Sequence, residues 1–354
     1  MKSVNINNKI ISDTNPCFII AEMAWSHDGS VEKAIKILDG ASDAKADAIC
    51  MHFTSVKDYM TEDYGLKHGV SVELNQETVY QYLERVNLKN EEWKKLVFHA
   101  KKQGLSVCIM CNDIPSIEFA NSLDIDCYII PPAAMVEENF VRNIGKRQKP
   151  VMVRIGGATL LEIEQTIKWI NDEGNNNIVL IHGFQNFPTP LEEMHIKFID
   201  TLKKRFSCPV GFADHVDAES EKALLIPLVS IGAGANLIEK HLTHNRGLKG
   251  EDFESALNPD EFRKLVQDIR ECEKSLGSSE IRDLSEKEKK YRLMSRKRVV
   301  AVRDIKNGEH ITKNLITFKR ANEGIYPDEV SKIFGKKAKT NIKREEGITL
   351  DKVI

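Results

Sequence analysis

Eight short apolar runs, separated by longer stretches with helical periodicity, fill the first 276 residues of the chain. The runs are residues 17–21, 46–53, 105–110, 127–130, 150–154, 177–182, 209–212 and 235–239. Helical patterns lie at 30–44, from about 76 and from 90, at 115–122, 137–147, 159–173, 191–205, 217–231 and 259–275. Short buried strands that alternate with helices are typical of a parallel sheet covered by helices. The repetition therefore predicts eight consecutive β/α units.

Eight such units predict a closed (β/α)8 TIM barrel, with a doubly wound open sheet as the competing interpretation. The open sheet is disfavoured because no glycine-rich phosphate loop follows the first strand, at 17–21. In a barrel the active site lies where the strands end at their carboxyl side. Candidate site residues by that rule are Glu22, His27, Cys50, His52, Met110, Ile129, Arg154, His182, Gln185, Asp214, His215, Glu239 and His241.

The segment 237–257 carries the densest group of ionisable residues at a strand end. It begins as an apolar run and then presents Glu239, His241, His244 and Asp252. Ionisable groups are rarely fully buried without a partner or a chemical role. We therefore interpret this segment as one wall of an active site.

Composition excludes several classes of function. The formal net charge of −2 argues against a nucleic-acid partner, and no apolar run reaches the length that spans a bilayer. The first residues lack the apolar core of a signal peptide. The seven cysteines are scattered and mostly sit in apolar runs, which suits reduced thiols. We expect a cytoplasmic enzyme without a membrane partner.

The sequence becomes more charged and less apolar after residue 276. A charged connector at 277–294 follows the barrel region, 1–276, and precedes a small domain at 295–354. Short strands are expected in this domain at 298–303, 316–319 and 336–342, with a turn at Lys306-Asn-Gly-Glu309. About 60 residues bury little apolar surface alone, so the domain is expected to lean on a barrel.

Six motifs occur in order along the chain: Phe18-Ile-Ile-Ala-Glu22 with Ser26-His-Asp-Gly29, Asn186-Phe-Pro-Thr-Pro190, Val210-Gly-Phe-Ala-Asp-His215, Ile238-Glu-Lys-His241, Arg303-Asp-Ile-Lys-Asn-Gly-Glu-His-Ile-Thr312 and Phe318-Lys-Arg-Ala-Asn-Glu-Gly324. Together they resemble the motifs of the sialic acid synthase (N-acetylneuraminate synthase) family. Members join a (β/α)8 barrel to a C-terminal antifreeze-like domain of β-clip type. The resemblance covers almost the whole chain.

The resemblance implies condensation of phosphoenolpyruvate with an open-chain sugar such as N-acetylmannosamine, giving a nonulosonate for surface carbohydrates. It implies a divalent metal, Mn²⁺ first with Mg²⁺ or Co²⁺ as alternatives, on His215 and His241. Candidate catalytic residues are Glu22, Asp214 and Glu239. Candidate substrate-binding residues are His52, Arg154, Gln185, Asn186, Asp252 and Arg320. Arg320 matches an arginine that reaches into a partner's barrel, which implies a domain-swapped homodimer.

The chain departs from this family where phosphoenolpyruvate would bind. Lysines expected in the second and fourth strands are replaced within Ile49-Cys-Met-His52 and Tyr128-Ile-Ile-Pro-Pro132. Each charge-assisted bond lost is worth about 1.5–3 kcal/mol. Arg154 either supplies a cation for a substrate anion or pairs with a carboxylate such as Glu22 or Glu239. Two functions stay open. The first is a synthase of this type. The second is a divergent member that acts either as a metal-dependent sugar aldolase, lyase or isomerase or as a non-catalytic partner subunit.

Overall fold

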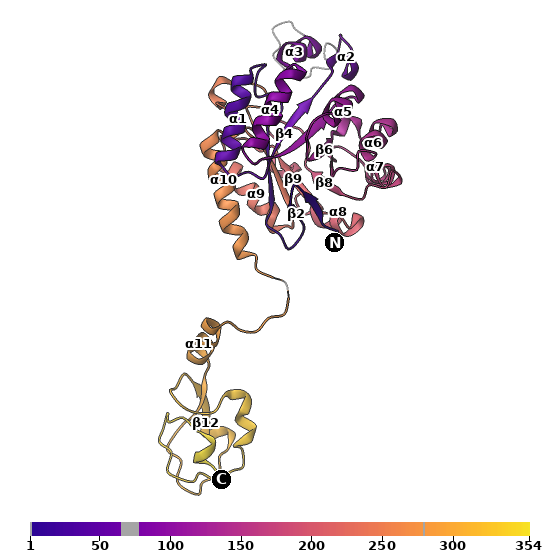
Figure 1. The fold of residues 1–354 in the computed structure, drawn as a ribbon. Helices are drawn as coiled ribbons and strands as arrows, with labels where there is room; N and C mark the ends of the chain where they lie inside the picture. Colours follow the sequence, from indigo (N-terminus) through magenta and orange to yellow (C-terminus); the bar gives the residue numbers. More distant parts are fainter. Residues whose placement is uncertain (1, 65–77, 279) are drawn as a thin grey trace. The chain divides into compact units, whose positions relative to one another are not determined.

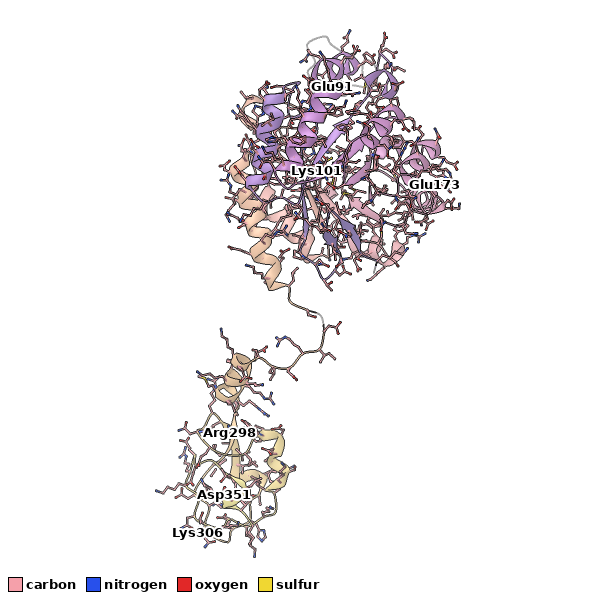
Figure 2. All side chains as sticks on the ribbon, in the orientation of Figure 1. Glu91, Lys101, Glu173, Arg298, Lys306 and Asp351 are labelled. Carbon is pink, nitrogen blue, oxygen red and sulfur yellow. The ribbon has the colours of Figure 1, made fainter. Side chains whose placement is uncertain are left out.

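The computed structural model describes residues 2–64, 78–278 and 280–354. The chain divides into two compact units, Met1–Gly277 and Ser278–Ile354, each with its own core (Figure 1). Figure 2 labels several charged side chains, among them Glu91, which is exposed on a helix of the first unit. Within the described ranges, no helix is both long and apolar enough to cross a membrane.

The first unit contains a closed barrel of eight parallel strands in the order β10-β3-β4-β5-β6-β7-β8-β9. The strands are β3 (Phe18–Glu22), β4 (Ala48–Phe53), β5 (Ser106–Cys111), β6 (Cys127–Ile130), β7 (Val151–Arg154), β8 (Ile178–His182), β9 (Val210–Asp214) and β10 (Leu237–His241). All eight lie within two residues of their predicted positions at both ends. The (β/α)8 prediction is confirmed, and the open sheet is excluded because β10 pairs with β3.

Helices surround the barrel (Figure 1). They are α1 (Val31–Asp43), α2 (Val56–Tyr59), α3 (Val79–Val86), α4 (Asn90–Lys102), α5 (Ile114–Asn121), α6 (Glu138–Gly145), α7 (Leu160–Asp172), α8 (Phe198–Phe206), α9 (Lys222–Gly232) and α10 (Pro259–Cys272). Side chains fix several starts: Ser30 accepts a hydrogen bond from the Lys33 N–H at α1, as capping predicts. The start predicted near 76 lies outside the described residues.

Two predicted helices begin too early. The prediction over 191–205 was wrong at its start, because His195 has a φ of 43°, which interrupts a right-handed helix before α8. The prediction over 217–231 was also wrong at its start. There Asp217 and Ser220 accept hydrogen bonds from backbone N–H groups two residues on, which favours turns until α9 begins.

Alternation along the strands separates the inside of the barrel from the layer beneath the helices. The inward side chains form one apolar cluster: Phe18, Ile20, Ala48, Cys50, Cys108, Met110, Cys127, Ile129, Met152, Val179, Ile181, Ala213 and Leu237. Their strand neighbours pack outward against the helices. Cys111 belongs to that outer cluster, so it and Cys108 face opposite sides of β5, as expected.

An N-terminal hairpin, β1 (Val4–Ile6) with β2 (Lys9–Ile11), was not predicted. Asn7 and Asn8 form its turn with φ values of 46° and 65°, a backbone region that asparagine tolerates. The hairpin adds Val4, Ile6 and Ile11 to the interior cluster. It lies against the amino ends of the strands, since Lys9 pairs at 2.9 Å with Asp47, which directly precedes β4. The carboxyl ends are therefore the end available for a site.

The second unit contains α11 (Glu286–Ser295) and an antiparallel pair, β11 (Arg298–Ala301) with β12 (Ile316–Lys319). Both strands were predicted. The strand predicted over 336–342 was wrong, because this segment makes only isolated bridges to His310, Val353 and Ile305. It pairs with three different segments one residue at a time, so no continuous ladder forms. Val299, Ala301 and Ile348 are among the residues of this unit's own small core.

Candidate active site

Arg154 is the central residue at the carboxyl end of the barrel. It ends β7 with a side chain 4% exposed, and its guanidinium pairs with both Glu22 and Glu239. Its Nη2 and Nε atoms lie 2.7 and 3.2 Å from Glu239 Oε2. Glu22 ends β3, and Glu239 lies in β10. Of the two roles considered for Arg154, pairing with a carboxylate is present in the structure. Binding of a substrate anion by Arg154 stays a prediction.

The two carboxylates differ in how firmly they are held. Both oxygens of Glu22 have partners: Oε2 meets Arg154, and Oε1 accepts the Ala24 N–H at 2.8 Å and lies 3.1 Å from His52 Nε2. Burial opposes ionisation, but Arg154 and His52 outweigh it and hold the pKa of Glu22 well below its usual value. Burial raises the pKa of Glu239 to about 7, and its Oε1 has no hydrogen-bond partner among the residues that the structure describes. Glu22 is the stronger partner of Arg154.

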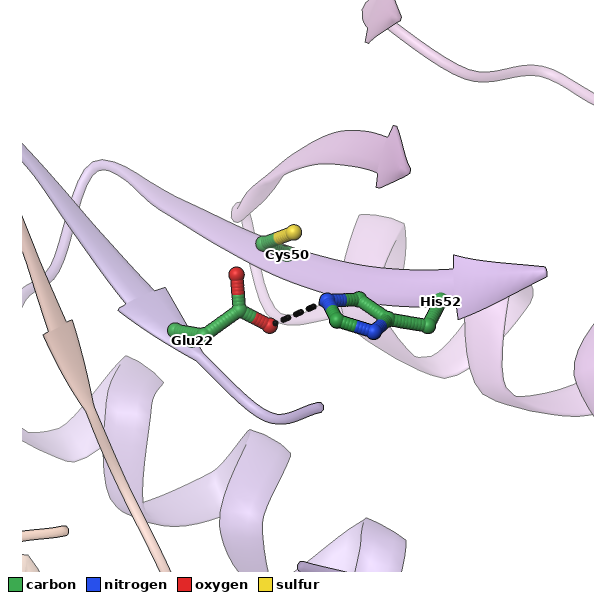
Figure 3. A group of neighbouring side chains, drawn as sticks. All are labelled: Glu22, Cys50 and His52. Atoms are coloured by element: carbon green, nitrogen blue, oxygen red, sulfur yellow. Dashed lines mark ion pairs between the residues drawn. The ribbon is translucent and has the colours of Figure 1, made fainter. Parts of the chain in front are cut away.

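Glu22, Cys50 and His52 form a compact group at the ends of β3 and β4 (Figure 3), with one ligand-type atom from each within 4.8 Å of the others. Burial and the nearby Glu22 raise the pKa of the Cys50 thiol well above its usual value, which disfavours the thiolate that binds metals. Arg154 Nη2 also lies 4.0 Å from Cys50 Sγ. A cation placed here would meet a protonated thiol and a guanidinium, so the arrangement does not favour one.

His215 and His241 form the better group for a metal. They follow and end the neighbouring strands β9 and β10, and their ring centroids are 5.2 Å apart. All four ring nitrogens are buried without a hydrogen bond to any described residue. Burial lowers the pKa of His241 to about 3 and that of His215 well below its usual value, so both rings are neutral. Neutral imidazoles with free lone pairs suit a divalent transition metal.

Two further side chains flank this histidine pair. Asp252 Oδ2 lies 3.5 Å from His241 Nδ1, and burial raises the pKa of Asp252 well above its usual value. Phe187 presents its ring edge-on to His215 and His241, at centroid distances of 5.0 and 5.6 Å. The sequence reasoning missed Phe187, although it lies inside the Asn186-Phe-Pro-Thr-Pro190 motif. An aromatic residue between Asn186 and proline in a recognised motif was the available signal.

Other predicted residues lie apart from this centre. Gln185 and Asn186 are exposed in the loop after β8, and Arg320 is exposed in the second unit, directly after β12. Asp214 lies in the outward register of β9, and its carboxylate pairs with Lys240 at 2.8 Å. His182 also points outward, against Phe198 and Phe212.

The side of the barrel opposite the histidines is apolar where the family resemblance predicts phosphate-binding lysines. Cys50, Met110 and Ile129 are buried in the interior cluster. Among the residues that the structure describes, Arg154 is the one lysine or arginine that is buried at this inner wall, since the Lys240 side chain points outward. A substrate anion that enters the barrel therefore has one cationic side chain to meet there.

Comparison with known proteins agrees with this geometry. Residues 37–281 match the NeuB family and residues 296–354 match the SAF domain. Pseudaminic acid synthase of Campylobacter jejuni is 33% identical over 336 residues, 92% of this chain and 93% of that protein. N,N'-diacetyllegionaminic acid synthase of the same organism is 30% identical over 331 residues, 93% and 97% of the two chains.

A solved structure shows the same fold. The N-acetylneuraminic acid (sialic acid) synthetase of Leptospira borgpetersenii, in complex with citrate, superimposes with a TM-score of 0.72 and 25% identity. The match covers 82% of this chain and 96% of that one. The sequence motifs, the barrel and the family match are mutually consistent, and the chain belongs to the NeuB family.

Proposed function

We propose that this protein is a nonulosonate synthase. It condenses phosphoenolpyruvate with an open-chain N-acetylated aminosugar of the N-acetylmannosamine type, and the product serves surface carbohydrate biosynthesis. The observation that carries the proposal is the convergence of Glu22, His52, His215, His241 and Asp252 at the carboxyl end of one barrel. The names of the relatives, synthases of pseudaminic and diacetyllegionaminic acid, support the same class of reaction.

The metal side of the site is the histidine pair. The ring nitrogens of His215 and His241, buried and without a hydrogen bond to any residue that the structure describes, fit a divalent ion, Mn²⁺ first, with Mg²⁺ or Co²⁺ as alternatives. Bound there, the ion would polarise the carbonyl of the sugar aldehyde. Asp252 lies beside His241 and accepts hydrogen bonds from sugar hydroxyls, while Gln185 and Asn186 contact the sugar from the exposed loop.

The anion side of the site is Arg154. To hold the carboxylate or phosphate of phosphoenolpyruvate, its guanidinium exchanges one of its two glutamates for the substrate. Glu239 is the one to leave, because its second oxygen has no hydrogen-bond partner in the described ranges, whereas both oxygens of Glu22 are engaged. The incoming anion replaces a charge-assisted bond worth about 1.5–3 kcal/mol with one of the same kind, and Glu239, whose pKa is about 7, can take up a proton as it loses the guanidinium.

The decisive test incubates the protein with phosphoenolpyruvate, Mn²⁺ and a panel of 2-acetamido sugars, and measures phosphate release. We expect release that needs both the sugar and the metal. Calorimetry should show metal-dependent binding of phosphoenolpyruvate. Absence of release with every sugar, together with absence of phosphoenolpyruvate binding, would contradict the proposal. It would favour the alternative of a metal-dependent sugar aldolase, lyase or isomerase, or of a non-catalytic subunit.

A melting experiment tests the metal site separately. Mn²⁺ at one hundred times its dissociation constant should add about 2.7 kcal/mol to the free energy of unfolding, because the ion binds only the native state. For a domain of this size that corresponds to a rise in Tm of roughly 5–10 °C. The His215→Ala/His241→Ala double variant should show no rise. An equal rise in that variant would place the ion elsewhere.

The domain-swapped homodimer and the cytoplasmic location stay predictions. Complementation tests the swap, because each active site would take His241 from one protomer and Arg320 from its partner. The His241→Ala and Arg320→Ala variants should each be inactive, and mixing them with exchange of subunits should restore activity. If the two residues act within one protomer, the mixed dimers stay inactive.

A further inference from the structure

A buried ion pair directly behind the two histidines has no role in the reaction described above. Asp214 Oδ2 and Lys240 Nζ are 2.8 Å apart, and both side chains are completely inaccessible to solvent. Each residue immediately precedes one of the histidines, His215 or His241. We propose that this pair is a positioning device that sets the separation of the two imidazoles. The inference rests on the proposed metal site.

The strand register places the pair behind the site. Asp214 and Lys240 are direct partners in the parallel pairing of β9 with β10. Alternation along the strands turns these two side chains outward beneath the helices, while the next residue in β10, His241, faces inward. The ion pair therefore joins β9 and β10 on the outer side of the barrel, one residue before the position of each histidine.

The backbone pairing of β9 with β10 stops at this same level. Its last partners are Lys240 and Asp214, so the ladder does not extend to the histidines. The ion pair is thus the last direct link between the two strands before the imidazoles. The second oxygen of Asp214 accepts the Val216 N–H at 3.0 Å. The Asp214 side chain is therefore tied to the backbone of the residue that follows His215.

The imidazoles have little else to orient them. Neither ring makes a hydrogen bond to a described residue. The His215 carbonyl accepts hydrogen bonds from Ser255 Oγ at 2.8 Å and Thr189 N at 2.9 Å, and the His241 carbonyl accepts one from Leu257 N at 2.9 Å. The two rings contact each other and Phe187, and Asp252 Oδ2 lies 3.5 Å from His241 Nδ1. The position of the strands therefore decides the position of the rings.

Stability alone does not explain the pair. Taking two charges out of water costs much of what their attraction returns, and replacing a buried ion pair with apolar residues of similar volume is often neutral or stabilising. The pair also balances charge, because a lone Lys240 behind the wall would repel a cation on the histidines. Retention of the pair is better explained by geometry and charge balance at the site.

The test compares the Asp214→Leu/Lys240→Met double variant with the wild-type protein. Free Mn²⁺ is measured by electron paramagnetic resonance, and folding by Tm. We expect a folded double variant that binds Mn²⁺ about 10- to 100-fold more weakly, the range typical of residues that orient metal ligands. The matched control is Asp126→Leu/Lys101→Met. Asp126 likewise accepts a backbone N–H and a lysine at 2.7 Å, but at the amino end of the barrel, and this variant should keep wild-type affinity.

Each outcome decides between the proposals. Wild-type affinity in the folded double variant would overturn the positioning role and leave the metal site intact. If the wild-type protein itself does not bind Mn²⁺, the proposed metal site fails and this inference fails with it. If the double variant does not fold, Asp214→Asn/Lys240→Gln gives the result, because it removes both charges together and keeps two polar side chains of similar size. Unchanged affinity there overturns the role, and a loss of about tenfold supports it.

Discussion

Replacing Arg154 with methionine should destabilise the barrel far more than the same replacement of a more exposed arginine. The Arg154 side chain is 4% exposed, and those of its partners Glu22 and Glu239 are 0% and 1% exposed. Arg154→Met keeps most of the apolar stem and removes the cation. Two carboxylates then stay buried, one of them with only His52 and the Ala24 N–H as partners.

Breaking a buried ion pair from one side costs about 3–5 kcal/mol, because the remaining charge is buried without compensation. For a domain of this size each kcal/mol lowers Tm by roughly 2–4 °C, so we expect a fall of about 6–20 °C. Arg142 is the matched control. It also pairs with several carboxylates, Glu138, Asp172 and Glu173, but its side chain is 27% exposed. Pairs of that kind contribute about 0–1 kcal/mol each.

Differential scanning calorimetry on Arg154→Met, Arg142→Met and the double variant Arg154→Met/Glu239→Gln would measure these effects. The Glu239→Gln change should recover part of the loss, because it removes one of the two carboxyl groups that Arg154→Met leaves buried without a cation, while Glu22 keeps its other partners. An Arg154→Met protein that melts within roughly 2 °C of wild type would refute the reasoning. So would a double variant no more stable than the single one.

Three further predictions concern the framework around the site. In the native protein a thiol reagent should label Cys272 rapidly and the six buried cysteines only after unfolding, as timed absorbance measurements would show. Asn8→Val should cost about 1–2 kcal/mol in chemical denaturation, because a β-branched residue resists its φ of 65°, whereas Asn5→Val on the exposed face of β1 should cost little. Gly183→Ala should destabilise more than Gly174→Ala: both glycines have positive φ, but only at Gly183 would a Cβ lie 2.3 Å from a backbone oxygen of β9.

The barrel could be predicted because its strands are buried on both faces. Such strands are continuous apolar runs, which stand out from amphipathic helices, and one of the two shortest, Cys127–Ile130, was located to the residue. The hairpin at Val4–Ile11 was missed because each strand has only three residues, too few to show a period. The Asn7-Asn8 pair, which is typical of a hairpin turn, could have indicated this hairpin. The strand predicted at 336–342 was wrong for another reason: Ala338, Thr340 and Ile342 alternate with polar residues as in a strand, but the partners of the segment are three separate segments.

The site could be predicted as a set of residues but not as an arrangement. Position at strand ends identified Glu22, Arg154, His215 and His241, because the carboxyl ends of parallel strands meet at one face. Which carboxylates Arg154 meets depends on side-chain directions across β3, β7 and β10, and no local pattern encodes them. The outward direction of Asp214 was different, since alternation from Phe212 and Ala213 already implies it.

The inner wall of this barrel is divided between two kinds of chemistry. On one side lie two neutral histidines whose ring nitrogens make no hydrogen bond within the described part of the chain, with Asp252 beside them, which suits a metal ion and a sugar. On the other side Cys50, Met110 and Ile129 leave Arg154 to meet an anion, and two glutamates already occupy it. The proposal that phosphoenolpyruvate displaces a carboxylate from Arg154 makes Glu239→Gln informative. If Glu239 competes with the substrate, that variant should bind phosphoenolpyruvate more tightly in calorimetry. Weaker binding would instead mean that Glu239 holds Arg154 in the orientation that the substrate needs.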